Sequence, residues 1–196
     1  KPVKKKSDES VAQPKRKPGR PRKGEVVAPK PPKRLDLQPA RTLADNLEDL
    51  PYQCDVGTKK NSKGYKESWT GYKLHLDIND AGLPISAVVT SASVHDSQVA
   101  IPLIKQTSSK VTYLYDLMDA AYDAKRINET IRHLGHVPII DKNGRGKEVI
   151  SMAPHEAERY KERSSAERAN GRLKEDFGAN NVMVKGHSKV TEHLLF

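Results

Sequence analysis

Positive charge and proline are concentrated at the start of the chain, and this distribution limits which part of it can fold. Residues 1–34 contain thirteen basic residues, three acidic residues and seven of the thirteen prolines, so this segment carries a net charge of +10. Residues 35–196 contain 22 basic and 22 acidic residues and are neutral overall. A highly charged segment with few apolar side chains cannot bury enough surface to offset the entropy lost on ordering. The sequence therefore predicts a disordered basic tail over residues 1–34 and a neutral folded body.

The neutral body is long enough for one hydrophobic core, and several protein classes are excluded. No apolar run approaches the roughly 18–20 residues of a membrane span, and the chain does not begin with the apolar segment of a signal peptide. Cys54 is the only cysteine, which excludes an internal disulfide and a multi-cysteine zinc site. These features predict an intracellular protein, cytoplasmic or associated with the nucleoid. Because the chain starts without Met and stops within Leu194-Leu195-Phe196, we expect a fragment truncated at its C-terminus.

The tail contains one motif suited to DNA. Residues 15–23 read Lys-Arg-Lys-Pro-Gly-Arg-Pro-Arg-Lys, a narrow Gly-Arg-Pro unit flanked by cations. Such a unit fits the narrow minor groove of A/T-rich DNA. It resembles an AT-hook in which Arg20, Arg22 and Lys23 would contact DNA, although Pro18 replaces the first arginine of the usual core. A solvated basic linker is the alternative, and generic attraction to DNA is the interpretation that we favour.

Hydrophobic periodicity predicts the order of elements in the body. Residues 35–51 read as a short helix and linker, because Leu43, Leu47 and Leu50 recur at helical spacing before Pro51. Three antiparallel strands follow, and helices then alternate with strands before one long helix. This order predicts an α/β fold, a mixed sheet flanked by helices. The predicted strands are 52–56, 72–78, 84–90, 111–118 and 137–140, the predicted helices are 96–105, 123–134 and 155–177, and residues 58–68 form a polar turn.

The long helix carries the most informative pattern. At 100° per residue, Tyr160, Arg163, Glu167 and Lys174 fall within one stripe of 60°. The alternative interpretation is a solvated face with intrahelical ion pairs. An adjoining apolar stripe, expected to face the sheet, contains Ala166, Leu173 and Phe177.

Two aspartates can join Glu167 in one site. Asp119 ends an apolar strand, where sites in open α/β sheets gather, and Asp55 lies on the first strand. If those strands are neighbours, the three carboxylates converge, and their mutual repulsion requires a cation such as Mg²⁺ or Mn²⁺. Asp77 is the alternative first carboxylate. Asp116 should point to the opposite face of its strand from Asp119, which favours a structural role.

Other polar residues are expected to have ordinary roles. Lys73 and His75 share a strand face with Asp77, which is expected to be solvated although it could touch DNA. Asp96 or Ser97, and Asp123, are expected to cap helices rather than to take part in catalysis. The basic loops 59–66 and 142–147 are either phosphate contacts or simply solvated.

Three segments together resemble a known family. The spacing Tyr160-x₂-Arg163-x₃-Glu167-x₆-Lys174 matches the signature of bacterial insertion-sequence transposases of the DDE type. Asp119-Ala-Ala-Tyr122 is similar to the segment around the second carboxylate of that family, and the segment that begins Cys54-Asp55-Val-Gly-Thr is similar to its first-carboxylate strand. The resemblance covers roughly residues 50–196.

This resemblance implies an RNase H-like catalytic domain over residues 52–196 that cleaves DNA strands and transfers them during transposition of an insertion sequence. It implies that Asp55, Asp119 and Glu167 bind two Mg²⁺ (or Mn²⁺) ions in a two-metal mechanism. Arg163 and Lys174 would hold phosphates, and Tyr160 would contact a phosphate or a base. The implied partners are transposon ends, target DNA and a second copy of the chain in a synaptic complex.

Two alternatives remain open at this point. The chain could be a non-catalytic remnant of a transposase that only binds DNA. It could also be an RNase H-like nuclease, although the Tyr-Arg-Glu-Lys stripe argues against that interpretation.

Overall fold

The structure is a computed structural model that describes residues 31–60, 63–144, 151–179 and 181–195. Residues from Pro32 onward group into one compact unit. The AT-hook-like segment with Arg20, Arg22 and Lys23, and the end of the basic loop 142–147, lie outside the described residues. No helix within the described ranges is long and apolar enough to cross a membrane.

The strands have the order and directions that the sequence predicted. β1 (Asp55–Lys60), β2 (Lys66–Ile78) and β3 (Pro84–Ser91) form an antiparallel sheet with β2 in the centre. β4 (Tyr115–Met118) pairs in parallel with β5 (Val137–Ile140). This mixed arrangement with flanking helices confirms the α/β prediction and is consistent with an RNase H-like fold. In the described part of the chain the ladders form two sheets, rather than one continuous sheet.

The first strand and the turn after it differ from the prediction. We expected a strand over residues 52–56 and a polar turn over 58–68, but β1 and the start of β2 form a hairpin through most of that segment. Lys59 lies opposite Glu67 and pairs with it at 3.5 Å. Cross-strand pairs of opposite charge favour a ladder that residue propensity alone does not predict. Asp55 therefore begins the strand, rather than lying within it.

Gly57 allows the base of this hairpin to close. It is buried, and a Cβ atom added there would lie 2.5 Å from Cζ2 of Trp69 and 2.8 Å from the carbonyl oxygen of Ala92. Only a hydrogen atom fits in this space. The indole ring thus packs directly over the backbone two residues after Asp55.

The turn between β2 and β3 is formed by an asparagine and a glycine. The Asn79 side chain accepts a hydrogen bond from the amide of Leu83 at 2.8 Å, and Gly82 has a φ of 79°. A short polar side chain and a glycine that tolerates positive φ are the usual components of such a turn.

The two middle helices confirm the prediction, but Asp96 and Asp123 do not cap them as predicted. α3 (Ser97–Ser108) and α4 (Lys125–His133) lie where the periodicity placed them, and Gly135 ends the second with a φ of 85°. Asp96 does not cap α3; it pairs with Lys73 at 3.0 Å. Asp123 does not cap α4; it accepts a hydrogen bond from the amide of Asn143 at 3.2 Å. Both carboxylates join segments distant in sequence, which a local capping rule cannot anticipate.

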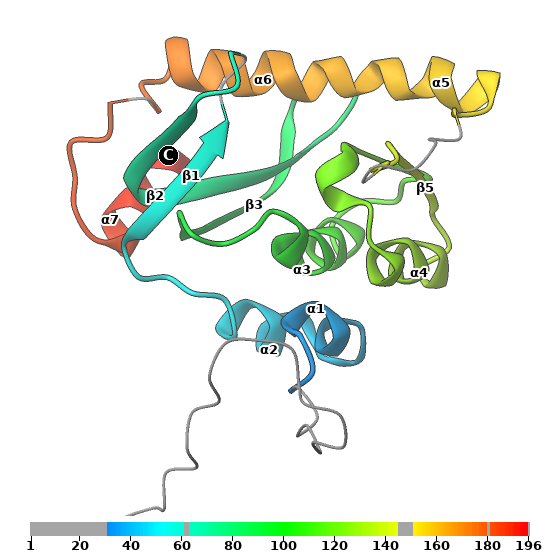
Figure 1. Cartoon of the computed structure of the whole chain (residues 1–196), viewed down its shortest axis with the longest axis horizontal. Helices are drawn as coiled ribbons and strands as arrows, with labels where there is room; N and C mark the ends of the chain where they lie inside the picture. Colours follow the sequence, from blue (N-terminus) through cyan, green and yellow to red (C-terminus); the bar gives the residue numbers. More distant parts are fainter. Residues whose placement is uncertain (1–30, 61–62, 145–150, 180, 196) are drawn as a thin grey trace, which may run out of the picture. The chain divides into compact units, whose positions relative to one another are not determined.

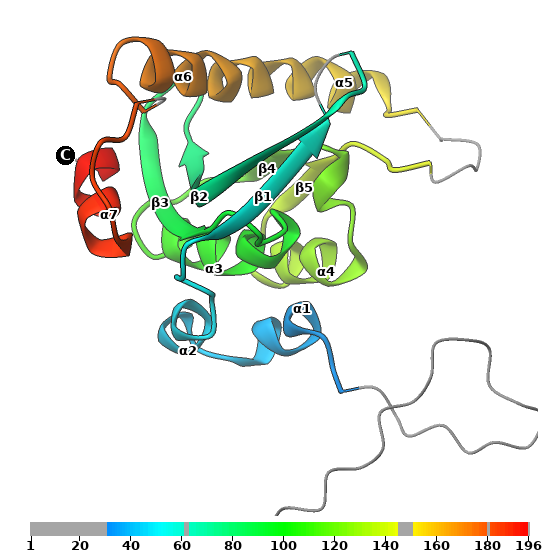
Figure 2. The ribbon, with the colours of Figure 1, turned by 60° about the vertical axis from the view of Figure 1, so that its left-hand side comes forward.

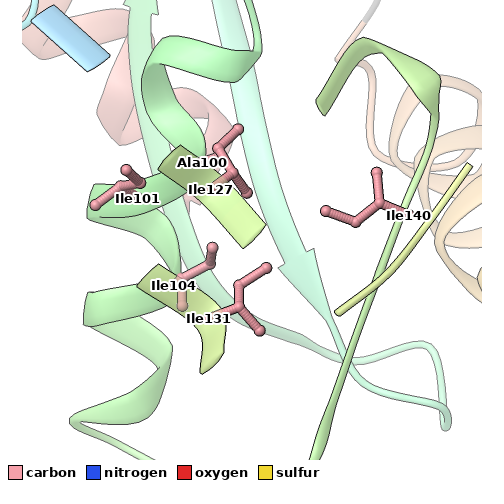
Figure 3. Close-up of a cluster of buried hydrophobic side chains, with 6 residues drawn as sticks. All are labelled: Ala100, Ile101, Ile104, Ile127, Ile131 and Ile140. Carbon is pink, nitrogen blue, oxygen red and sulfur yellow. The ribbon is translucent and has the colours of Figure 1, made fainter. Parts of the chain in front are cut away.

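The main core is formed by isoleucine side chains (Figure 3). They come from α3, α4 and β5, and Met118 and Tyr122 pack against their edge. This packing holds the parallel strands against both helices. The cluster consists of Ala100, Ile101, Ile104, Ile127, Ile131 and Ile140.

The predicted long helix is present with one irregular turn. α5 (Pro154–Tyr160), a 3-10 turn (Lys161–Arg163) and α6 (Ser164–Glu175) follow one another along one side of the strands, with α3 and α4 on the other side (Figures 1 and 2). The 3-10 turn contacts β4 and α6 contacts β2, so this helix crosses both sheets. Ser165 and Ala169 are the buried positions of α6, whereas Phe177, predicted to face the sheet, is 65% exposed.

Further short helices complete the body. One end helix packs against β2 and β3, and the helices at the start pack on α3. Lys105 of α3 donates to three backbone carbonyls of the starting segment, at 2.6–3.1 Å. These elements are α1 (Arg34–Leu37), a 3-10 turn (Gln38–Ala40), α2 (Leu43–Glu48), which confirms the predicted short helix, and α7 (His187–Leu195), which was not predicted.

Replacing glycine by alanine should have opposite effects on protein stability at Gly57 and at Gly171. Gly57→Ala should destabilise the protein by about 1–3 kcal/mol, because the new methyl group overlaps the Trp69 ring. Gly171→Ala, within α6 and with no atom near the new methyl group, should stabilise it by roughly 0.5–1 kcal/mol through helix propensity. Urea unfolding measures both. Equal effects of the two substitutions would contradict the close approach of Trp69 to Gly57.

Candidate active site

Asp119 lies directly after β4, at the carboxyl end of the strand. Its side chain accepts a hydrogen bond from the Ala121 amide at 2.9 Å and so caps the 3-10 turn Ala120–Tyr122. The β-strand places the backbone at the sheet edge, and the cap fixes the side chain there. Asp119 is half-buried.

The signature residues of the long helix meet at its irregular turn. In a 3-10 turn, residues three apart are eclipsed, whereas in an α-helix they are offset by 60°. Arg163 accordingly lies over the ring of Tyr160, with its Cζ atom 5.6 Å from the ring centroid. Arg163 also pairs with Glu167 at 2.6 Å. The helix thus contains an intrahelical ion pair, Arg163–Glu167, as the alternative interpretation of a solvated face predicted. It also contains the contact between Arg163 and the Tyr160 ring.

β4, which ends just before Asp119, contacts the 3-10 turn of this helix, and the charge of Asp119 acts on two nearby tyrosine hydroxyls. Burial raises the pKa of Tyr160, and the negative charges of Asp141 and Asp119 raise it further. Burial raises the pKa of Tyr122 strongly, and the charges of Asp96 and Asp119 add to the effect. Arg163 acts on both hydroxyls in the opposite sense. The charge of Asp119 therefore reaches the hydroxyl of Tyr160, and the strand before Asp119 contacts the turn that contains Arg163.

Asp55 is the first residue of β1 and lies next to Ser93. Hydrogen bonds from the Ser93 hydroxyl and from the Val56 amide, at 2.7 Å, lower the pKa of Asp55, and its side chain is exposed. Ser93 belongs to the loop between β3 and α3. No hydrogen bond or ion pair joins Asp55 to Asp119 or Glu167 in the described residues.

The same loop holds a charged pair that sequence patterns missed. Lys73 donates to the carbonyl of Val94 at 2.9 Å and to the carboxylate of Asp96 at 3.0 Å. The charge of Asp96 is among those that act on Tyr122. Lys73 therefore fixes the loop that connects the surroundings of Asp55 with those of Asp119. The only signal in the sequence was the alternation that places Lys73 on the polar face of its strand.

The polar face of β2 is covered, which corrects our expectation of a solvated face. His75 is 5% exposed and shares a hydrogen bond with Thr90 at 2.9 Å. Burial lowers the pKa of His75 to about 4. Thr107 of α3 donates to Asp77 at 2.5 Å on the same face. The face is polar because α3 and the preceding loop supply hydrogen-bond partners, not because it meets water.

A cleft of about 460 Å³ lies between β4, the end of β2 and the long helix. Asp77 and Asp116 form part of its lining, and Arg159, Glu162 and Arg163 line it from the helix. Asp116 is 5% exposed; it accepts a hydrogen bond from Tyr113 at 3.1 Å and lies 3.2 Å from Nδ1 of His136. These partners agree with the structural role predicted for Asp116.

Burial favours the protonated forms of these two aspartates. Burial raises the pKa of Asp116 to about 6, the charge of Asp77 adds to this, and His136 opposes it. Burial likewise raises the pKa of Asp77, against the hydrogen bond from Thr107.

The described residues include no group of three or more His, Cys, Asp or Glu side chains placed to hold a metal ion. Asp119 is near Tyr160 and Arg163, and Glu167 is paired with Arg163, but Asp55 is joined to neither. Lys174 is exposed in the last turn of α6. The oxygen donors suit a hard cation in type, whereas their spacing in this structure does not form a metal site.

The buried aspartate predicts a specific pH effect on stability. A raised pKa means that the folded state binds the proton more tightly, so stability from Asp116 is lost as pH rises from about 4 through 6. His75, with a lowered pKa, has the opposite effect below pH 6.5. Asp116→Asn keeps the hydrogen bonds without the charge. As the pH rises from 5 to 7, the free energy of unfolding of Asp116→Asn should increase by on the order of 1–3 kcal/mol relative to that of wild type. Urea unfolding measures this difference.

The control is Asp80→Asn, which removes one exposed carboxylate from the turn after β2. Its stability difference from wild type should stay nearly constant over the same pH range. A flat difference for Asp116→Asn as well would contradict the raised pKa of Asp116.

Comparison with known proteins agrees with the arrangement of these elements. The family described as "Transposase DDE domain" matches residues 49–196, which is well over half of the chain. No curated protein and no solved structure matches it significantly. The match covers β1 with Asp55, the end of β4 with Asp119 and the helix with Glu167. The chain belongs to the transposase DDE domain family, whose members act on DNA in transposition and typically use divalent metal ions.

Proposed function

We propose that this chain is the catalytic domain of an insertion-sequence transposase that cleaves DNA strands and joins them to a target. The observation that supports it best is the position of Asp119, directly after β4, a strand that contacts the 3-10 turn ending at Arg163. This contact supports a common site for two parts of the family pattern that are far apart in sequence. We further propose that it acts on nucleoid DNA, with two copies pairing two transposon ends.

We propose Asp55, Asp119 and Glu167 as the catalytic carboxylates. The choice of Asp55 over Asp77 is supported by their surroundings. Asp55 is exposed and its pKa is lowered, so it is charged at neutral pH and open to a ligand. Asp77 is occupied by Thr107, and its pKa is raised by burial. A charged, accessible oxygen is the better ligand for a hard cation.

A requirement for Mg²⁺ or Mn²⁺, with two ions at the site, is part of this proposal. Such ions supply an activated nucleophile and stabilise the leaving oxygen in phosphoryl transfer. The residues of the chain must supply the rest. Glu167 is free to accept a new partner because its ion pair with Arg163 is exposed, and exposed pairs contribute little to stability. Arg163, once released, offers two parallel N–H groups to a DNA phosphate.

Tyr160 and Lys174 would complete the contacts to DNA. Half-buried Tyr160 lies under the guanidinium of Arg163, and its hydroxyl would donate to a phosphate. Lys174 lies eleven residues after Arg163 on the same helix and acts as a separate point charge.

Substitution of the carboxylates tests the catalytic proposal. Asp119→Asn and Glu167→Gln should each lower Mg²⁺-dependent cleavage of a supercoiled plasmid by on the order of 10²–10⁴-fold, because several kcal/mol of transition-state stabilisation is removed. Glu129→Gln, an exposed carboxylate on α4, is the control. Asp55→Asn should be as inactive as Asp119→Asn, and Asp77→Asn should retain cleavage. Full activity of purified Asp119→Asn would refute the proposed site.

A non-catalytic DNA-binding remnant is the second candidate. It is favoured by the lack, within the described residues, of three carboxylates gathered around one point. It would bind DNA with no metal-dependent cleavage in the wild type, so the plasmid assay separates it from the first proposal.

The basic tail should supply non-specific attraction to DNA under either proposal. Removing residues 1–30, which leaves α1 with Arg34 in place, deletes eleven basic and three acidic residues and so a net charge of +8. The slope of log affinity against log salt concentration should become shallower by about 0.9 for each DNA phosphate that the tail no longer neutralises. Fluorescence anisotropy with a duplex oligonucleotide measures this slope. A tail of equal length with Gln in place of Lys and Arg is the control and should behave like the deletion; an unchanged slope in both variants would contradict a role for the tail charge.

A further inference from the structure

Two arginines one turn apart on the long helix each lie over a tyrosine ring. Arg163 lies over Tyr160 within the helix, as described above. Arg159 lies over Tyr115, the first residue of β4, with its Cζ atom 4.0 Å from the ring centroid. The shorter contact is the one that joins helix to sheet. A guanidinium over an aromatic face is held by cation–π attraction and by stacking.

Arg159 differs from the other arginines of this helix in its lack of a polar partner among the described residues. Arg163 pairs with Glu167, Arg168 donates to Ser164 at 2.9 Å, and Arg172 pairs with Asp176 at 3.4 Å. The guanidinium of Arg159 makes no hydrogen bond or ion pair with any residue that the structure describes. The side chain is exposed at the rim of the cleft. Its N–H groups are therefore open to a ligand while its position is set by Tyr115.

This combination suits an oxyanion ligand. An arginine binds phosphate through two parallel N–H groups, and stacking on its flat face leaves those edges open. A side chain already held in position loses less entropy on binding than one that must first be ordered. The carboxylates of Asp77, Asp116 and Glu162 line the cleft itself, so a phosphate would be bound at its rim, on the solvent side.

We infer that Arg159 is a DNA-phosphate-binding residue, positioned by Tyr115 one helical turn before Arg163. Four residues of helix correspond to about 6 Å along the axis, so the two arginines would serve neighbouring phosphates of one strand. The inference rests on the proposed action on DNA and extends it to a residue outside the Tyr-Arg-Glu-Lys pattern. Tyr115 acts through Arg159 and is a positioning residue.

The experiment measures the binding of the full chain to a labelled duplex oligonucleotide by anisotropy, over a salt series and without divalent ions. Arg159→Ala should lower affinity about 10-fold and make the salt slope shallower by about 0.9. Arg159→Lys keeps the charge, so it should retain the slope with an intermediate affinity. Arg172→Ala removes the same charge from the same helix, where Asp176 already compensates it, and should bind like wild type.

Variants of Tyr115 separate positioning from charge. Tyr115→Phe retains the ring and should bind like wild type, whereas Tyr115→Leu should lower affinity with an unchanged salt slope. Circular dichroism melting confirms that each variant is folded. Arg159→Ala that binds as tightly as Arg172→Ala overturns the inference, as does a Tyr115→Phe variant as weak as Tyr115→Leu.

The outcomes also distinguish this inference from the proposed catalysis. A wild type that binds DNA through Arg159 but cleaves nothing in Mg²⁺ leaves the inference standing and removes the catalytic proposal. If cleavage depends on Asp119 and Arg159→Ala binds DNA like wild type, the catalytic proposal stands and the inference about Arg159 is wrong. A full chain that binds no duplex at all overturns both.

Discussion

The packing of isoleucine side chains between α3, α4 and β5 is the interaction on which the rest of the fold depends. It holds the parallel strand pair against two helices, with Tyr122 and Met118 at its edge. Asp119 lies between those two residues in sequence, so the core sets the position of this carboxylate through its nearest neighbours. A polar side chain at the edge of a close-packed core is held in place without being buried itself.

The long helix connects this core to the antiparallel sheet and carries most of the charged groups of the site. Its 3-10 turn contacts β4, and α6 contacts β2. In this turn, side chains three residues apart lie above one another, and Arg163 therefore lies over Tyr160. Irregular turns inside helices are frequently found at functional positions. Here Arg163, at the end of the irregular turn, pairs with the carboxylate of Glu167.

The distribution of charge bears on how a neutral body would act on DNA. The positive charge of the chain lies in the first 34 residues, and the remainder carries equal numbers of basic and acidic residues. Under the proposed function, the tail would supply attraction to DNA at long range and residues of the body would supply contact at short range.

Local patterns predicted the elements well where periodicity was strong. The strands at 84–90 and 137–140, the helices α3 and α4, and the long helix were all found close to the predicted bounds. Predictions failed where a contact distant in sequence competes with a local rule. Asp96 and Asp123 bind Lys73 and Asn143 instead of capping their helices. The segment 58–68, predicted as a turn, forms most of a hairpin through cross-strand pairing.

The sequence by itself determined the concentration of positive charge in residues 1–34, the α/β order of elements and the family, because composition, periodicity and motif spacing are properties of the chain. Only the tertiary structure decided which face of β2 is covered, that Asp116 is buried and Asp77 half-buried with their pKa values raised, and that Arg159 lies over Tyr115. These facts depend on which segments pack together. Burial and charge pairing arise from neighbours in space, and the spacing of residues along a chain does not contain them.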